Sequence, residues 1–224
     1  MAYLSEEESD RIREAVAAAE SSSGGEITTA IIAESDDYGF RELLVALVGG
    51  VVAWSAAIAA QDPLAALLQR VLWGWEPWML AVIQGAIGML AGLVIYYLLQ
   101  IPALDRLIIP RRVMNEAVRR RAARHFVESG TYDTVDNTGV LIFVSLLERR
   151  VELIADRGIN AVVPSGTWDS IVADLTRGIR DDNLSDAMVT AVTRVGEVLA
   201  GKVQRRPDDE NELTNRTSEL EKGS

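Results

Sequence analysis

The stretch Gly139–Asp156, GVLIFVSLLERRVELIAD, decides the fold of this chain. Its first half is almost continuously apolar, which is typical of a strand that is buried on both faces. Leu147-Glu148-Arg149 then supplies a turn, and Arg150–Asp156 is expected to return as a second strand. Two strands joined by so short a loop pair antiparallel. We therefore predict a β-hairpin at the centre of an α/β fold.

The N-terminal residues predict a helix and then a further strand. Ser5 and Glu8 have the spacing of a capping box, so we expect a helix over Ser5–Ser21. Serines and glycines end this helix, and Glu26–Ala33 (EITTAIIA) has the β-branched residues of a strand. About 30 residues cannot bury a core alone. The strand at Glu26–Ala33 must therefore pair with strands that come later in the chain.

The rest of the α/β pattern consists of helices around the predicted hairpin. Apolar periodicity predicts one helix from about Arg111 to Glu128, and two more at Thr167–Gly178 and Leu184–Val203. From Lys202 the chain becomes polar and charged. Residues 214–224 are therefore expected to form a flexible tail.

Two apolar runs without a charged residue interrupt this pattern. Leu43–Ala60 contains 18 residues and Met79–Leu99 contains 21. Roughly 20 helical residues span a hydrocarbon core of about 30 Å. Both runs are apolar on every face, which argues against the alternative of two core helices in a soluble domain. We predict a transmembrane hairpin over residues 41–101, inserted into one α/β domain made of residues 1–40 and 102–213.

The flanking charges predict the orientation of this hairpin. Arginines crowd the segment after the second run, whereas the connection Gln61–Trp78 has Arg70 as its single basic residue. Basic residues stay preferentially in the cytoplasm, so both termini and the α/β domain are expected there, with the short loop outside. The residues predicted to anchor the hairpin at the bilayer surfaces are Trp73, Trp75, Trp78, Tyr96, Tyr97, Arg111 and Arg112.

Composition excludes several kinds of function. The formal net charge is −11, so a nucleic-acid partner is not expected. The absence of cysteine excludes disulfides and thiolate chemistry. No charged residue within the apolar runs marks an ion path, which argues against a channel. Gly85, Gly88 and Gly92 give the second run a face of small residues, which either packs the two helices together or joins copies of the chain into a homo-oligomer.

The order of these elements resembles the TPM domain family. The resemblance rests on the first helix, the EITTAII strand, the stretch NTGVLIFVSLLERRVELIAD with its following Gly-Ile, and a helix led by Trp168. It implies an α/β/α sandwich around a small mixed sheet. It also implies divalent-cation binding at acidic residues by the sheet edge in some members, and a weak acid phosphatase activity in others. Many members carry a signal peptide, which the acidic and polar N-terminus does not predict for this chain, so the resemblance is to the bacterial membrane subgroup and indicates the inner membrane.

Four residues are candidates for a Ca²⁺ or Mg²⁺ site. Asp136 and Asn137 precede the first strand of the hairpin and Asp156 ends the second, so the hairpin would bring them to one end of the sheet. Carboxylate, amide and carbonyl oxygens are the ligands that these cations prefer. By resemblance, the acidic cation site of the family maps onto Asp136 and Asp156, with Glu26 as a further candidate. The alternative is that these residues form ordinary turns, for which Asp-Asn-Thr-Gly is well suited.

Two functions remain open at this point. The first is a membrane-anchored interaction or assembly module for other membrane or envelope proteins, with or without a bound cation. The second is a membrane-bound, metal-dependent phosphatase, which would need a metal-activated water and a positive clamp on the phosphoryl oxygens. The residues supply possible ligands but no catalytic residue that we can assign. His125, the single histidine, is expected to be a residue of the helix end whose protonation the neighbouring arginines disfavour. We favour the first function.

Overall fold

The computed structural model describes residues 3–101, 109–164, 166–206 and 211–222. The chain divides into two compact units. The α/β unit joins Met1–Asp36 to Arg111–Ser224, and the hairpin unit is the segment Asp37–Pro110 between them. The α/β unit is therefore assembled from two parts of the sequence.

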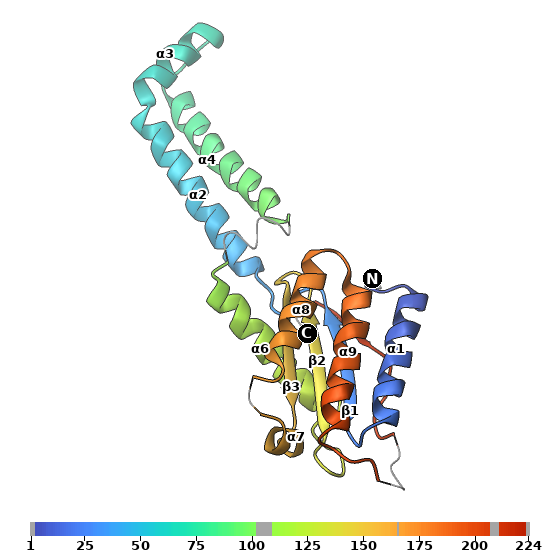
Figure 1. Cartoon of the computed structure of the whole chain (residues 1–224). Helices are drawn as coiled ribbons and strands as arrows, with labels where there is room; N and C mark the ends of the chain where they lie inside the picture. The colour runs from blue at the N-terminus through green and yellow to red at the C-terminus, as the bar shows by residue number, and fades with distance from the viewer. Residues whose placement is uncertain (1–2, 102–108, 165, 207–210, 223–224) are drawn as a thin grey trace. The chain divides into compact units, whose positions relative to one another are not determined.

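A four-stranded mixed sheet with the order β3-β2-β1-β4 forms the centre of the α/β unit (Figure 1). The strands are β1 (Glu26–Ile32), β2 (Gly139–Ser145), β3 (Arg150–Ala155) and β4 (Ser218–Leu220). β2 and β3 form the expected antiparallel hairpin, and β1 pairs parallel to β2 along its whole length. The first strand thus pairs with a strand that follows the hairpin unit, as we expected.

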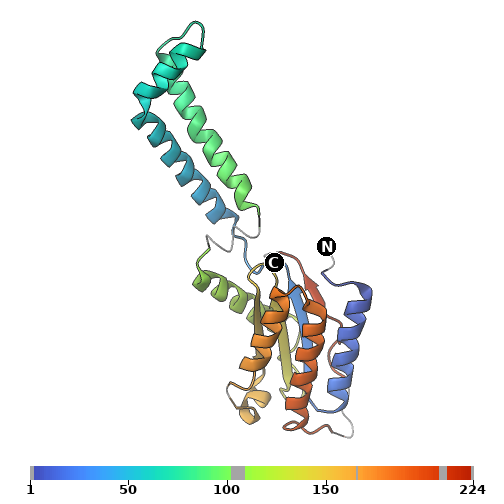
Figure 2. The ribbon, with the colours of Figure 1, turned by 45° about the horizontal axis from the view of Figure 1, so that its top comes forward.

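Helices cover both faces of this sheet, which confirms the α/β/α sandwich (Figure 2). The larger core lies between one face and the helices α1 (Glu6–Ser21), α8 (Asp169–Arg180) and α9 (Leu184–Ala200). On the other face, α6 (Arg111–Glu128) packs Val118 and Ala122 against Leu141 and Phe143. Successive strand residues point to opposite faces, so apolar strands such as β2 serve both cores.

Local signals explain where two helices of the α/β unit begin. The capping box of α1 is present, since Ser5 Oγ accepts from Glu8 N at 3.2 Å and Glu8 Oε2 accepts from Ser5 N at 2.8 Å. A short helix that we did not predict, α7 (Arg157–Val162), follows β3 directly. Asp156 is its N-cap residue, so the predicted strand end is also a helix start.

The prediction of a flexible tail at residues 214–224 is wrong for its central part. β4 pairs parallel to the end of β1, with Ser218 opposite Ala30 and Leu220 opposite Ile32. Thr217 Oγ1 and Thr29 Oγ1 lie 2.8 Å apart just before this pairing. The physical reason is that β1 would otherwise be an edge strand with unpaired backbone groups. A three-residue strand has too little periodicity to be found in the sequence.

The end of β1 that leads toward the hairpin unit is fixed to the turn between β2 and β3. The Glu148 carboxylate accepts from Ser35 N at 3.0 Å and also from Ser145 Oγ. Ser35 Oγ and Ser145 Oγ lie 2.7 Å apart, and Asp36 forms an ion pair with Arg120 at 3.2 Å. All three residues of the Ser35–Ser145–Glu148 cluster are buried. The chain therefore leaves the α/β unit at a defined point.

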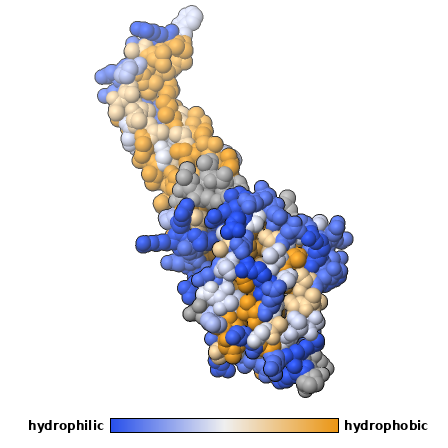
Figure 3. All heavy atoms as spheres, viewed as in Figure 1, coloured by the Kyte–Doolittle hydropathy of each residue, from blue (hydrophilic) through white to orange (hydrophobic). Residues whose placement is uncertain are grey.

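The hairpin unit consists of α2 (Gly39–Ala59), α3 (Gln61–Val71) and α4 (Trp78–Leu99). α2 and α4 are long and apolar enough to cross a membrane, with a mean hydropathy of 2.0 each. Only 22% and 11% of their most apolar windows are buried in the structure. Large apolar side chains such as Leu47, Val52 and Leu90 point outward, and Figure 3 shows this apolar surface. The two helices therefore lack the burial that is usual for core helices.

Glycines allow α2 and α4 to approach closely. A Cβ atom on Gly88 would lie 2.8 Å from Trp54 Cβ, and one on Gly92 would lie 3.2 Å from Ala46 O. Gly85, in contrast, has no such neighbour within 4 Å. Gln84, the strongest polar side chain of α4, is buried and donates from Nε2 to Ala57 O at 3.2 Å. Gly88 and Gly92 thus pack the two helices together, and the homo-oligomer stays a prediction.

Candidate functional site

The four predicted cation ligands come from one end of the sheet. In the parallel register of β1 and β2, Glu26 lies opposite Gly139, and on the other side of β2 the Asp156 amide donates to Gly139 O at 2.8 Å. Asp136 and Asn137 directly precede β2. β1 and β2 begin where β3 ends, so the topology collects all four residues there. This end is opposite to the one where β1 leads toward the hairpin unit.

Two loops cross at this end of the sheet. Gly158 N donates to Asn137 O at 3.0 Å. A Cβ atom on Gly158 would lie 2.6 Å from Asn137 O and 2.7 Å from Asp136 O, so only glycine fits there. Asn137 has φ of 56°, in the left-handed region that asparagine tolerates better than most residues. The motifs Asp-Asn-Thr-Gly and Asp-Arg-Gly-Ile are therefore the two halves of one loop crossing.

The carboxylates at the loop crossing have different partners. Asp156 Oδ1 accepts from Arg157 N at 2.6 Å, while its Oδ2 is buried and has no hydrogen-bond partner among the described residues. Asp136 forms an ion pair with Arg206, with 3.2 Å between Oδ2 and Nη1. In the part of the chain that the structure describes, no three His, Cys, Asp or Glu side chains are grouped closely enough to hold a metal. A cation here would need backbone carbonyls as ligands and would have to displace Arg206.

Glu26 belongs to a second feature at the same end, a pocket of about 130 Å³. This pocket, which we call the Glu20 pocket, is lined by Ala17, Glu20, Ser21, Glu26, Arg205, Asn211 and Asn215. Its centre is the carboxylate of Glu20, which is buried and accepts from Ile27 N at 2.9 Å and from Asn215 Nδ2 at 2.8 Å. Burial raises the pKa of Glu20 to about 7, and the charge of Glu26 adds to this effect.

Sequence reasoning missed Glu20, although one signal was present. Ile12, Val16 and Glu20 are spaced by four residues, so helical periodicity puts Glu20 on the buried face of α1. An acid at such a position is expected to have a specific partner. Its partner Asn215 lies 195 residues away along the chain, at a position that no local pattern indicates.

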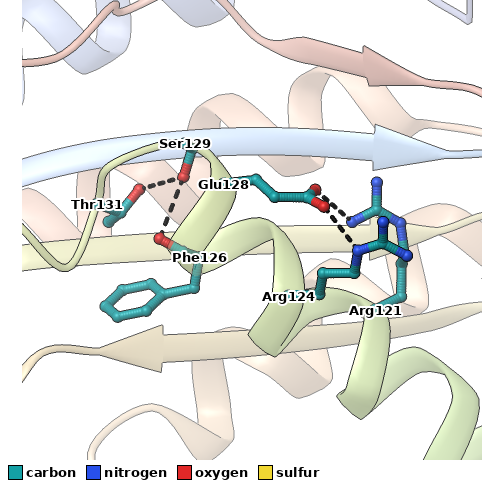
Figure 4. A network of polar contacts seen from close by, with 6 residues as sticks. All are labelled: Arg121, Arg124, Phe126, Glu128, Ser129 and Thr131. Carbon is teal, nitrogen blue, oxygen red and sulfur yellow. Dashed lines mark hydrogen bonds and ion pairs between the residues drawn. The ribbon is translucent and has the colours of Figure 1, made fainter. Parts of the chain in front are cut away.

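A polar network positions the loop that leads from α6 to Asp136 (Figure 4). At the end of α6, Glu128 accepts from both Arg121 Nη1 at 3.1 Å and Arg124 Nε at 2.6 Å. Thr131 Oγ1 then donates to Thr28 Oγ1 on β1 at 2.9 Å. Because this bond is buried and joins residues far apart in the sequence, it ties the start of the loop to the sheet.

His125 lies in the last turn of α6. Its side chain is buried, and neither ring nitrogen has a hydrogen-bond partner among the described residues. Burial lowers its pKa, and the charge of Arg121 lowers it further. Its ring lies 6.2 Å from that of Phe143, as measured between centroids. His125 is therefore a neutral packing residue, and burial disfavours its protonation more than the arginines do.

The predicted anchoring residues of the hairpin unit occupy the ends of its helices. Trp73 and Trp78 lie at the connection between α3 and α4 and are exposed, as is Tyr97 near the end of α4. Trp75 and Tyr96 are half-buried. Arg111 and Arg112 are exposed at the start of α6 in the α/β unit. Their contact with lipid stays a prediction.

Comparisons with known proteins agree with the architecture. The TPM domain family matches residues 106–198, which include α6, the hairpin of β2 and β3, α8 and most of α9. The chain carries a TPM domain. Because β1 completes its sheet, the domain extends beyond the matched residues to the N-terminal part of the chain.

A solved structure supports the fold of the TPM domain. The BA42 protein of the psychrophilic bacterium Bizionia argentinensis, determined by NMR, superposes with a TM-score of 0.57 over 98% of this chain and 97% of its own. The sequences are 19% identical, so this similarity concerns the fold alone. No curated protein sequence matches the chain.

Proposed function

We propose that this protein is a membrane-anchored binding module. In this proposal α2 and α4 cross the inner membrane of a bacterium, and the TPM domain works at its cytoplasmic face as an interaction or assembly site for other membrane or envelope proteins. One observation carries the proposal: the hairpin unit, whose large apolar side chains point outward, is inserted between β1 and β2 of a single sheet. Both ends of the hairpin therefore return to the same side of the membrane.

The orientation rests on the distribution of charge. Arg111 and Arg112 begin α6 and are exposed, so they are available to anionic headgroups close to the end of the apolar segment. The connection between α2 and α4 carries Arg70 as its single basic residue. Tryptophans at that connection are the side chains expected at a membrane–water interface. Together these residues support a cytoplasmic TPM domain and a short loop outside.

We further propose that the loop crossing binds Ca²⁺ or Mg²⁺. The buried Asp156 Oδ2, the Asp136 carboxylate and the crowded carbonyls of Asp136 and Asn137 are hard oxygen ligands of the kind these ions prefer. Such an ion would neutralise the two carboxylates and would hold the crossing loops together in place of the Asp136–Arg206 ion pair. The loop crossing would then be a cation-stabilised surface for a partner.

No feature of the described residues specifically favours the phosphatase over the binding module. Phosphoryl transfer needs a positive clamp in addition to a metal. At the loop crossing Arg206 is paired with Asp136, and the Arg157 side chain is exposed. The binding module is therefore the function that the geometry supports best.

Reporter fusions test the orientation. A reporter that is active only outside the cytoplasm should stay silent when it is fused after Ser224 and should be active when it is inserted at Gly74, between α3 and α4. The Gly74 insertion is the positive control for expression and membrane insertion. Activity after Ser224 would overturn the orientation.

Calorimetric titration of the detergent-purified chain tests the cation. Ca²⁺ or Mg²⁺ should bind the wild type, and Asp156→Asn or Asp136→Asn should abolish binding. Asparagine also caps helices, so Asp156→Asn should keep α7 folded. Asp169→Asn on α8 is the matched control and should bind like the wild type. No binding at millimolar cation would remove the site, while hydrolysis of a phosphomonoester that disappears in Asp156→Asn would favour the phosphatase.

A further inference from the structure

The helix α3 follows α2 after a bend at a single residue. Ala60 is both the C-cap of α2 and the N-cap of α3, since Ala60 N donates to Ala56 O at 3.0 Å and Leu64 N donates to Ala60 O at 3.1 Å. α3 lies close to α4 as well as to α2, so it does not continue along the axis of α2. Figure 1 shows α3 across the end of the pair that α2 and α4 form. The connection between the two long helices therefore contains a folded element.

α3 has one apolar face. Its large apolar side chains recur with the spacing i, i+3, i+4 and i+7 of one side of a helix, and they are Leu64, Leu67, Leu68 and Val71. Ala66 and Gln69 lie on the other side of the same turns. None of the residues 61–71, all of which the structure describes, is buried, and Leu67 and Val71 are 57% and 71% exposed. The apolar face of α3 is therefore open to whatever surrounds the hairpin unit.

The lengths of α2 and α4 give the depth of this face in a bilayer. α2 has 21 residues and α4 has 22, so at 1.5 Å per residue they are about 32 Å and about 33 Å long. Each already matches a hydrocarbon core of about 30 Å. α3, at the end of both, is then at the depth of the headgroups, where an apolar face meets acyl chains and a polar face meets water. Figure 3 shows hydrophilic residues at this end, next to the apolar surface of the hairpin unit.

The residues around α3 indicate which lipids it would contact. Trp73, just after the helix, and Trp78, at the start of α4, are exposed, and indole rings favour the membrane–water interface. The charged residues of the connection 61–77 are Asp62, Arg70 and Glu76. Helices that depend on anionic lipid carry many Lys and Arg residues instead. Apolar contact, and not charge, is therefore the attraction that α3 can offer to a membrane.

We propose that α3 is an interfacial helix, which binds the boundary between lipid headgroups and acyl chains through its apolar face. Zwitterionic and anionic lipids serve equally well. The helix fixes the depth of the hairpin, because a shift along the membrane normal would move its polar face into hydrocarbon or its apolar face into water. The inference rests on the proposed crossing of the membrane by α2 and α4, but not on their orientation.

Spin labelling of the full chain in proteoliposomes tests this interfacial helix. The chain has no cysteine, so one introduced cysteine is the single labelling site. Leu67→Cys and Val71→Cys carry the nitroxide on the apolar face, and Ala66→Cys and Gln69→Cys are the matched controls on the other side. Electron paramagnetic resonance measures collisions with oxygen, which dissolves among acyl chains, and with a water-soluble nickel chelate present on both sides of the membrane.

The expected result is a contrast between neighbouring sites. In phosphatidylcholine vesicles, the ratio of oxygen to nickel collisions should be several-fold higher at Leu67 and Val71 than at Ala66 and Gln69. Added phosphatidylglycerol should leave this contrast unchanged. Nickel access that is equal on the two sides would place α3 in water and would overturn the proposal. A contrast that requires phosphatidylglycerol would also overturn it, because charge would then hold the helix.

Leu90→Cys, near the middle of α4, separates this inference from the proposed function. Its label should meet oxygen and be shielded from nickel if α4 crosses the membrane. Nickel access at Leu90 would overturn the crossing and the interfacial helix together. Shielding from nickel at Leu90 with equal nickel access at Leu67 and Ala66 would overturn the interfacial helix alone. Shielding of Leu67 and Val71 from both probes would also overturn it, because a second copy or another protein would then cover the face.

Discussion

The helices α9 and α4 are both rich in apolar residues but place them in opposite ways. α9 buries Met188, Val192 and Leu199 on one face, as a surface helix of a water-soluble domain does. α4 buries Gln84, Gly88 and Leu99 and directs most of its other large apolar side chains outward. In the TPM domain apolar burial holds helices to the sheet, whereas in the hairpin unit close backbone contact and side-chain hydrogen bonds such as that of Gln84 join two helices. The difference supports the proposed placement of the hairpin unit in a membrane.

The largest expected effect comes from two leucine substitutions that compare burial directly. Leu141→Ala removes a fully buried side chain from β2 and should cost about 2–5 kcal/mol of stability. Leu90→Ala on α4 changes a side chain that is 58% exposed and should leave stability almost unchanged in detergent. Thermal unfolding of each variant, followed by circular dichroism, measures both. A loss in Leu90→Ala as large as in Leu141→Ala would break the comparison.

Two glycines of α4 sharpen the comparison at a smaller magnitude. Gly88→Ala places a methyl group 2.8 Å from Trp54 Cβ and should destabilise the helix pair by about 1–3 kcal/mol. Gly85→Ala meets nothing within 4 Å, so it should be neutral or raise the stability of the helix by up to about 1 kcal/mol. Unfolding midpoints in the same detergent distinguish the two variants. Equal losses in both would mean that close contact does not hold the hairpin unit together.

The smallest expected effect is the pH dependence of stability that comes from His125, which is buried on the α6 side of the TPM domain. Burial keeps the pKa of His125 below its ordinary 6.5, so the unfolded chain takes up a proton more readily than the folded one. Stability should therefore fall as the pH drops below about 6.5. His125→Phe, which places a second aromatic ring beside Phe143, should reduce this acid loss in unfolding measured at pH 7 and pH 5. If His125→Phe lost as much stability between pH 7 and pH 5 as the wild type, the loss would come from carboxylates and not from His125.

The sequence predicts best the helices and strands whose apolar pattern extends over many residues. The apolar run of β2, the periodicity of α6 and α9 and the two membrane-length helices were all found with nearly their observed bounds. β4 and α7 were missed because three and six residues carry little periodicity, and because β4 exists only where the edge of β1 needs a partner. Asp136 and Asp156 were expected at one end of the sheet, because an antiparallel hairpin brings the start of its first strand beside the end of its second.

The rest of the site depends on where the segment after α9 runs. The pairing of Asp136 with Arg206 and the contact of Glu20 with Asn215 both join residues of that segment to distant parts of the domain. No local pattern records such pairings. Only the tertiary fold, which leads the segment after α9 back along the domain, brings these side chains together.

The pairing of β1 with β2 also sets an order of events on the ribosome. Residues 33–138 lie between the two strands, so β1 leaves the ribosome before its main partner is made. At 5–20 residues per second, the strand waits roughly 5–20 s for Gly139 to be translated. In the proposed membrane topology, the apolar helices reach the insertion machinery during that time. The sheet consequently closes only after the hairpin unit has been synthesised, and a nascent chain stopped before β2 would carry an unpaired, aggregation-prone EITTAII strand.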